Sequence, residues 1–470
     1  MERSSMAFDY KPASDEYLEK RTLKRHARVL HLWALGVGAV ISGDFFGWNF
    51  GLATGGFGGM FYALVIMTVM YMGLCASIAE LSPALPHTGG AYSFARAAMG
   101  PWAGYITGLA ENMEYILTPA TIVVGVGGYL GAIFNTPKNW EPGWWLVCYA
   151  IFVALNVWGV EVSFQFSIAI TVAALATLAV FFIGAVPLYD FARWTGPWMP
   201  DGWNGVLTCL PFAVWLYLGI EQLPLAAEES HDPQRDMPRA LAYGLLTVVA
   251  GGFLTLFLCA GIAPGAAKVG ASNEPLFLGF QTIFGTGAST RVLALVACTG
   301  LIASFHTIIF AYGRQIYSLS RAGYFPVWLS VTHGTRKTPQ RALIAGSVLG
   351  YCVALMIYLA GQESPVGAIL LNMAVFGAVI AYVLQMVSFL VLRRKYPRLD
   401  RPFVSPLGVA GAVVAALIAG ATLIALFINP AYNKGVIGAA IWFLLGILYF
   451  AFRGRHQLVL SPEEQFAEKL

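Results

Sequence analysis

Residues 162–188 read VSFQFSIAITVAALATLAVFFIGAVPL and contain no charged side chain. Two further uncharged runs of similar length occupy residues 240–267 and 365–392. A helix of about 20 consecutive apolar residues crosses the hydrocarbon core of a bilayer. Each run is therefore long enough to span a membrane, and the sequence predicts an all-α membrane protein.

The overall composition supports the same class. Of the 470 residues, 58% are hydrophobic and only 11% are charged, whereas about a quarter of the residues in soluble domains are charged. A soluble chain of this length would need more polar surface. The length rule predicts about twelve spans, near residues 29–53, 58–81, 102–134, 143–159, 161–187, 203–223, 239–264, 291–320, 341–361, 365–392, 405–429 and 434–452.

The distribution of Lys and Arg between these spans predicts their orientation. If the N-terminus is cytoplasmic, 23 of the 28 basic residues fall in inside segments. The other five lie in outside segments: Lys138, Arg193, Lys268, Arg291 and Lys434. Cytoplasmic loops of membrane proteins carry an excess of Lys and Arg. We therefore expect an even number of spans, with both termini in the cytoplasm.

The two terminal segments are polar. The first 28 residues lack the apolar stretch of a signal peptide, so residues 1–28 are expected to form a cytoplasmic tail. The segment after Phe452 is about 18 residues long, too short for a separate output domain. This argues against a membrane sensor that merely keeps a transporter-like core.

Four acidic residues lie inside or beside the predicted spans: Asp44, Glu111, Glu114 and Glu221. A charge at the centre of a membrane helix costs roughly 2.5–3.5 kcal/mol on insertion scales. Such residues usually face the bundle interior or a water-filled cavity and take part in function. For Glu111, a structural pairing near the cytoplasmic entry is an equally good interpretation.

Two of these acids follow sequences that can interrupt a helix. Asp44 comes after Ser42-Gly43 in the first span, and Glu221 comes after Gly219 in the sixth. Unwound backbone at membrane depth is tolerated only where it lines a cavity or meets a ligand. Transporters with inverted repeats bind substrate at such breaks. Ordinary glycine-containing helices are the simpler interpretation, but two breaks offset by five spans favour an inverted repeat.

Spacings typical of enzymes, metal sites or phosphate-binding loops are absent from the sequence. The six cysteines fall within apolar spans without metal-ligand spacing. We therefore predict no enzymatic activity, no cofactor, no metal site and no nucleic-acid partner. The expected partners are the lipid bilayer and a small-molecule substrate.

Five short stretches carry a family resemblance: 80–92 (ELSPALPHTGGAY), 100–105 (GPWAGY), 227–240 (AEESHDPQRDMPRA), 321–326 (RAGYFP) and 401–403 (RPF). Together they resemble the amino acid–polyamine–organocation (APC) family, over roughly residues 25–455. Within that family, residues 40–50 (VISGDFFGWNF) look most like the ethanolamine permeases.

The resemblance implies a LeuT-type fold of twelve transmembrane helices, with a 5+5 inverted repeat and broken helices 1 and 6. Residues 29–394 would form the ten-helix transport core, 395–452 two additional helices, and 453–470 a cytoplasmic tail. It also implies a bacterial plasma (inner) membrane permease that works by alternating access.

The residue after the first break suggests the substrate. In amino acid carriers of the family an apolar residue stands where this chain has Asp44, and exposed amides bind the substrate carboxylate. Two like charges about 4 Å apart repel by roughly 4 kcal/mol at an effective dielectric of 20. Asp44 would instead attract an ammonium group, and the ring of Trp215 would add roughly 0.5–2 kcal/mol of cation–π attraction.

These arguments predict import of a small cationic amine, most of all ethanolamine, with choline and related amines as further candidates. The alternative is an amino acid or polyamine permease or exchanger, with Asp44 binding the amine of the substrate. Asp44 could also be protonated, or hydrogen-bond the exposed backbone of the break. The resemblance places the substrate at Ser42, Gly43, Asp44, Phe45, Glu114, Trp215, Leu218, Gly219, Glu221, Ser304 and Phe305.

Ion coupling is less determined by the sequence. Proton-coupled members of the family often carry a Lys in span five, where this chain has Ala174. We therefore expect uniport, exchange, or proton coupling through an acid, with candidates Glu111, Glu114 and Glu221. His306 is a further candidate. His306 could equally serve only to hydrogen-bond neighbouring helices. Carbonyls of span one with Ser304 could bind sodium, but the sequence favours this less.

Overall fold

The structure is a computed structural model that describes Phe8 and residues 10–194, 198–272, 274–285, 290–361, 366–428 and 432–469. Residues 1–7 and 9 of the expected N-terminal tail, with its Arg3, lie outside the described residues, as do Pro365 and Leu470. The described chain is almost entirely helical; its only two strands, β1 (Tyr10–Lys11) and β2 (Leu458–Val459), pair in parallel.

The longer helices follow the predicted spans closely. They are α2 (Val29–Val40), α4 (Phe50–Ala84), α6 (Pro101–Phe134), α7 (Glu141–Trp158), α8 (Val160–Ala185), α9 (Gly202–Val214), α10 (Pro233–Gly261), α13 (Thr290–Arg321), α14 (Gln340–Ala360), α15 (Val366–Lys395), α16 (Gly408–Ile428) and α17 (Asn433–Phe452). Among the described residues, nine helices are long and apolar enough to cross a membrane. The predicted all-α membrane class is confirmed.

Shorter elements connect them. They are α1 (Asp15–Glu19), α3 (Ser42–Phe45), α5 (Gly90–Met99), η1 (Lys138–Trp140), η2 (Val186–Leu188), η3 (Phe191–Trp194), η4 (Ile220–Glu229), α11 (Ala266–Gly270), α12 (Pro275–Phe284), η5 (Val327–Ser330), η7 (Gly454–His456) and α18 (Pro462–Lys469). Helices α5, α11 and α12 lie outside the predicted spans, because all three are too short to span a bilayer.

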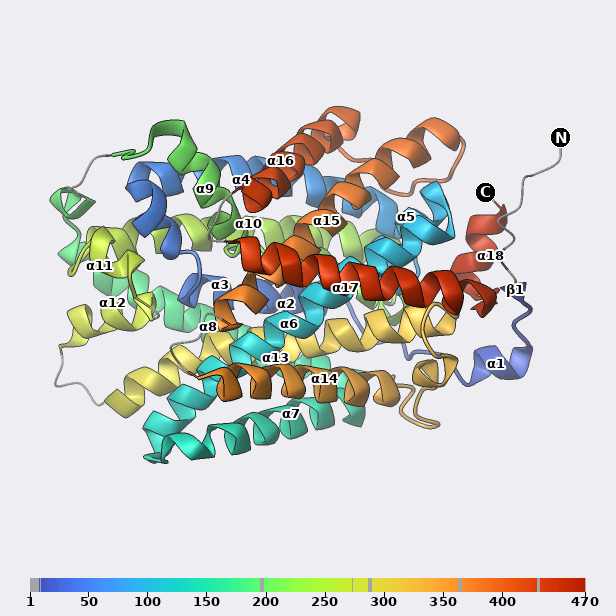
Figure 1. Cartoon of the computed structure of the whole chain (residues 1–470), viewed down its shortest axis with the longest axis horizontal. Coiled ribbons are helices and arrows are strands. Elements are labelled where there is room, and N and C mark those ends of the chain that lie inside the picture. Colours follow the sequence, from blue (N-terminus) through green and yellow to red (C-terminus); the bar gives the residue numbers. More distant parts are fainter. Residues whose placement is uncertain are drawn as a thin grey trace.

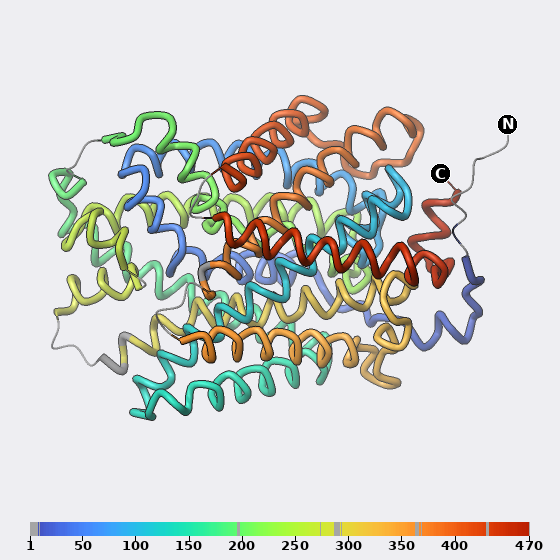
Figure 2. Tube along the Cα trace, in the orientation of Figure 1, coloured from blue at the N-terminus to red at the C-terminus, as the bar shows by residue number. Residues whose placement is uncertain are grey.

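The helices run along the long axis of the molecule, with α2 and α3 near its centre (Figure 1). Helix α2 contacts α8, α10, α13 and η4, and its residues from Ala34 to Val40 are buried. Helix α6 packs against α13 and α15, and α4 packs against α9 and α10. The path of the chain in Figure 2 brings segments from both halves of the sequence around α2.

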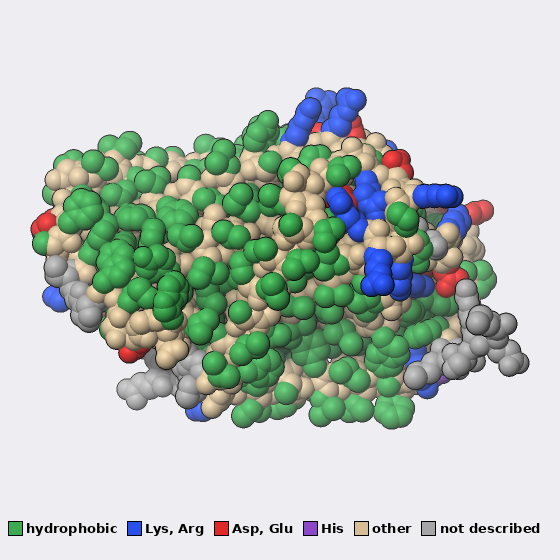
Figure 3. Space-filling model, turned by 90° about the horizontal axis from the view of Figure 1, so that it is seen from above, with side chains coloured by type: hydrophobic (Ala, Val, Ile, Leu, Met, Phe, Trp, Pro, Cys, Tyr) green, Lys and Arg blue, Asp and Glu red, His purple; other side chains and the backbone are tan. Residues whose placement is uncertain are grey.

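The outer surface matches a membrane protein. Large apolar side chains on the peripheral helices are strongly exposed, among them Leu359, Leu417, Ile428 and Leu445. Figure 3 shows hydrophobic side chains over the middle of the face in view, whereas most Lys and Arg side chains gather toward the end where the two termini lie. Apolar patches this extensive would be unfavourable in water and indicate contact with lipid.

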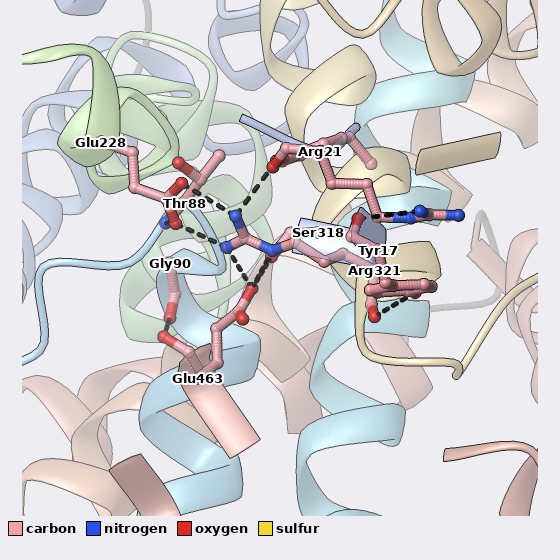
Figure 4. Close-up of polar contacts among 10 residues, drawn as sticks. Tyr17, Arg21, Thr88, Gly90, Glu228, Ser318, Arg321 and Glu463 are labelled. Atoms are coloured by element: carbon pink, nitrogen blue, oxygen red, sulfur yellow. Dashed lines mark hydrogen bonds and ion pairs between the residues drawn. The ribbon is translucent and has the colours of Figure 1, made fainter. Parts of the chain in front are cut away.

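The end that carries the termini is held together by buried ion pairs (Figure 4). The guanidinium of Arg321 donates to Glu228 at 2.9 Å and to Glu463 at 2.6 Å. Glu464 is buried and pairs with Arg96, and Tyr324 donates to its other oxygen at 2.9 Å. The C-terminal segment was expected to be a tail. It packs instead as α18 against α5 and α13, because Arg96 of α5 and Arg321 of α13 pair with its glutamates.

The charge on Glu228 depends on this network. Burial by itself raises the pKa of Glu228, but the Arg321 guanidinium outweighs burial and lowers the pKa from 4.5 to about 2. A depressed carboxyl pKa contributes stability that is fully present above pH 4.5 and is lost as the pH falls toward 2. The network is therefore fully formed at neutral pH.

We expect Glu463→Gln to destabilise the protein by about 1–3 kcal/mol, because it removes one charged partner of a buried Arg321. Thermal unfolding of the purified protein in detergent measures the change. Glu468→Gln is the matched control, since its side chain is 51% exposed and touches Arg96 only at 3.5 Å. Equal unfolding temperatures for the two variants would contradict a stabilising role for Glu463.

Candidate functional site: two helix breaks in contact

The first break follows the short helix α3. Ser42, Gly43 and Asp44 remain helical, and the chain becomes extended only at Phe46, with φ −162° and ψ 167°. Gly47 then takes a φ of +96°, a conformation that favours glycine. The break therefore lies about one turn later than the predicted position at residues 42–44.

Asn49 explains this shift. Its side-chain oxygen accepts a hydrogen bond from the Gly47 amide at 3.2 Å, and its Nδ2 donates to the carbonyls of Val269 and Ser272 at 2.8 and 2.7 Å. The turn is thus anchored to the segment around α11. Sequence reasoning missed Asn49, although asparagine side chains commonly hydrogen-bond nearby backbone groups in turns.

The second break lies between α9 and the 3₁₀ helix η4. Helix α9 ends at Val214, and Gly219 adopts a φ of +109°. The Gly219 amide donates to both carboxylate oxygens of Glu221, at 3.1 and 3.0 Å. Here the predicted break at Gly219 and the observed one coincide.

The two breaks touch each other. A Cβ added at Gly43 would lie 1.9 Å from the carbonyl oxygen of Trp215, and one added at Gly219 would lie 3.0 Å from Ala39. Only residues without a side chain allow the backbones to approach this closely. The Trp215 ring also covers Gly47, 3.4 Å from the position of a Cβ there, and lies tilted against Phe46 with centroids 6.5 Å apart.

Three of the four predicted acids gather beside the second break. Glu221 accepts from the Tyr382 hydroxyl at 2.8 Å, and its carboxyl group lies within interaction range of that of Glu114 on α6. Glu111, one turn earlier on α6, accepts from Gln315 Nε2 at 2.7 Å. The Oε2 atom of Glu114 is buried without a hydrogen-bond partner in the described part of the chain.

Asp44 lies apart from these acids. Its carboxylate accepts from Thr255 Oγ1 at 2.8 Å and borders Gly251 on α10. It also lines a mostly apolar cavity of about 180 Å³ between α2, α8 and α10. Successive residues of an α-helix point about 100° apart; since Gly43 faces Trp215, Asp44 is turned toward α10. The structure therefore does not place Asp44 in one cage with Glu114 and Glu221.

Residues 304–306 of α13 likewise point in different directions. Ser304 faces α2: its hydroxyl donates to the Gly38 carbonyl at 2.9 Å and accepts from the Ser42 amide at 3.0 Å. Phe305 instead packs edge-on against Tyr149 of α7, with ring centroids 4.9 Å apart. Of these three, only Ser304 reaches the breaks.

His306 faces α7 and α8. Its ring nitrogens lie 3.1 Å from the Ser163 carbonyl and 3.3 Å from Asn156 Nδ2.

The remaining predicted residues lie close to the breaks. Phe45 packs on Gly300 of α13, and Leu218 is buried beside the second break. The predicted residues that meet at the breaks are Ser42, Gly43, Phe45, Glu114, Trp215, Leu218, Gly219, Glu221 and Ser304.

Within the described ranges no group of three His, Cys, Asp or Glu residues could hold a metal ion. Two backbone carbonyls of α2 instead accept hydrogen bonds from side-chain hydroxyl groups. Thr171 of α8 donates to the Ala34 carbonyl at 3.0 Å, as Ser304 does to Gly38. These two bonds tie the first broken helix to α8 and α13.

Comparison with known proteins identifies the family. A family model described as amino acid permease matches residues 28–452, most of the chain. The chain belongs to the amino acid permease family. It is therefore a multi-pass membrane transporter of small molecules and not an enzyme, as the APC resemblance predicted.

Curated bacterial proteins are similar over nearly their whole length. An uncharacterized transporter of Rhizobium meliloti is 28% identical over 447 residues, covering 92% of this chain and 93% of that protein. The branched-chain amino acid permease of Bacillus subtilis is 25% identical over 458 residues, 93% and 95% of the two chains. The methylthioribose transporter of the same organism is 24% identical over 466 residues, 94% and 96%.

We expect Gly43→Ala to lower both stability and uptake by this permease, because the new methyl group would collide with the Trp215 carbonyl. Overpacking of this kind costs about 1–3 kcal/mol or more. Thermal unfolding and uptake into proteoliposomes measure the two effects. Gly128→Ala on α6 is the control, since nothing lies within 4 Å of its added Cβ. If both variants behave alike, the contact between the breaks is not needed.

Proposed function

We propose that this permease carries a small substrate with an ammonium group, most of all an amino acid, by alternating access around the two breaks. The observation that carries the proposal is the group of buried acids beside Gly219. None of Glu111, Glu114 and Glu221 forms an ion pair with Lys or Arg in the described part of the chain. Buried charges are favourable only when paired, and a substrate ammonium would supply the partner.

The proposed architecture is a LeuT-type fold of twelve spans. Helices α2–α3 and α9–η4 would be the broken first and sixth spans of a 5+5 inverted repeat. Residues 29–394 would form the transport core and 395–452 two additional helices. The offset of five spans and the contact between the breaks support this arrangement, since transporters with such repeats bind substrate where broken helices meet.

The proposed location is a bacterial inner membrane with both termini in the cytoplasm. The bacterial relatives support the first part. The gathering of Lys and Arg at the end that carries the termini supports the second (Figure 3). The end with α11 and α12 would then face outward.

The position of Asp44 favours an amino acid as the substrate. Asp44 was expected to repel a substrate carboxylate, but its carboxylate accepts a hydrogen bond from Thr255 on α10. The ammonium would bind near Glu114 and Glu221, beside the contact between the two breaks. The branched-chain amino acid permease among the relatives supports the same substrate class.

Ethanolamine or a related amine remains the second candidate. The excess of buried acids over cations beside the second break favours a substrate with a net positive charge. A competition experiment separates the two: labelled substrate uptake is challenged with leucine, alanine, arginine, ethanolamine and choline. Displacement by ethanolamine and choline but not by the neutral amino acids would replace the amino acid proposal with the amine one.

We expect Glu221→Gln to weaken substrate binding about 10- to 100-fold, because a charged hydrogen bond contributes roughly 1.5–3 kcal/mol. A thermal-shift titration of purified protein against amino acids and small amines measures the loss. Glu161→Gln is the control, because Glu161 is an exposed acid at the start of α8. Unchanged binding in Glu221→Gln would remove this carboxylate from the ammonium site.

Proton coupling is proposed to run through three acids. Glu111 and Glu114 lie on α6, and Glu221 lies on η4. His306 would be structural, given its bonds to Ser163 and Asn156, and sodium is less favoured because Ser304 already bonds the Gly38 carbonyl. Two adjacent carboxyl groups are most favourable when they share a proton.

In proteoliposomes with an inward proton gradient, we expect Glu114→Gln to lose gradient-driven accumulation while retaining exchange of internal for external substrate. Removing the titratable group breaks the link to protons but leaves the amide able to hydrogen-bond. Parallel uptake with and without a proton gradient measures the difference. Accumulation that still follows the gradient in Glu114→Gln would exclude this residue as the coupling group.

A further inference from the structure

A second cavity, of about 160 Å³, lies beside the first break. Its walls are Phe45 and Phe46, three residues of α6 (Thr121, Gly125 and Tyr129), Glu274 before α12, and Ala297 and Leu301 of α13. Helix α12 lies at the end of the molecule opposite the termini (Figure 1).

The chemistry of this cavity is acidic and aromatic. Glu274 is exposed, and its amide donates to Ser272 Oγ at 2.9 Å, which orients the residue at the start of α12. The Tyr129 hydroxyl lies within interaction range of the Glu274 carboxylate. Glu274 forms no ion pair in the part of the chain that the structure describes. A carboxylate beside aromatic faces binds organic cations by charge and cation–π attraction.

The cavity shares a wall with the breaks. The Phe45 ring packs on α13, where a Cβ at Gly300 would be 2.2 Å away. The Phe46 ring lies against that of Trp215, which covers Gly47 of the first break. The two aromatic rings that line the cavity, Phe45 and Phe46, both belong to the segment that forms the first break.

We propose that this cavity is an outer holding site, in which Glu274 and the Tyr129 ring bind the ammonium group of the substrate before it reaches the breaks. Movement of Phe45 and Phe46 would then let the ammonium pass from Glu274 to Glu221. The inference rests on the proposed function, because it assumes the same ammonium substrate. It adds a second binding site, on the side that the proposed orientation makes external.

Kinetics of the full-length protein in proteoliposomes test the proposal. We expect Glu274→Gln to raise the KM for uptake about two- to tenfold with little change in kcat, as loss of a partly exposed cation site should. Tyr129→Phe, which keeps the ring, should change KM less than Tyr129→Leu. Glu141→Gln, at the same end of the molecule on α7, is the matched control and should leave KM unchanged.

Equilibrium binding of ethylammonium chloride gives an independent readout. Glu221→Gln should leave one weak class of site, and Glu221→Gln combined with Glu274→Gln should leave none. If Glu274→Gln matches the unmodified protein in both KM and binding, the holding site is wrong while the proposed function stands. If Glu274→Gln weakens binding but Glu221→Gln does not, the central site is wrong and the outer one stands. If the unmodified protein binds no ammonium compound, both fail.

Discussion

The carbonyl oxygen of Trp215 occupies the space that a side chain at Gly43 would fill, 1.9 Å from the position of its Cβ. This contact brings the ends of two interrupted helices together in the centre of the molecule. Interrupted helices leave backbone groups that must find partners within the protein. At the first break these partners are the side chains of Asn49 and Ser304, which accept hydrogen bonds from backbone amides. At the second break the Glu221 carboxylate accepts from a backbone amide.

The acids beside the second break follow from the same constraint. Burying a carboxylate is costly unless hydrogen bonds and a counter-charge compensate. The Glu221 carboxylate accepts hydrogen bonds from the Gly219 amide and the Tyr382 hydroxyl, and the Glu111 carboxylate accepts one from Gln315. Glu114 keeps one oxygen without a partner among the described residues. A cation or a proton that binds to these carboxylates would therefore find most of their hydrogen bonds already formed.

The two ends of the molecule differ in their polar contacts. At the end with the termini, Arg321 joins η4 to α18 through Glu228 and Glu463 (Figure 4). Arg96 joins α5 to Glu464 at the same end. At the opposite end a cavity reaches Phe45 and Phe46, with Glu274 exposed beside it. Breaking buried ion pairs is expensive, so these pairs hold the segments at the end with the termini together.

The sequence by itself determined the membrane class, most helix bounds, the four intramembrane acids and the family, because uncharged runs and short motifs are properties of local sequence. Only the tertiary structure decided where those side chains point. Asp44 turns to Thr255, Phe305 to Tyr149 and His306 to Ser163, although Asp44 and Phe305 each stand next to a residue that faces a break. Direction depends on helix phase and on partners distant in the chain, as does the folding of the C-terminal segment onto Arg96 and Arg321, and no local pattern encodes such pairings.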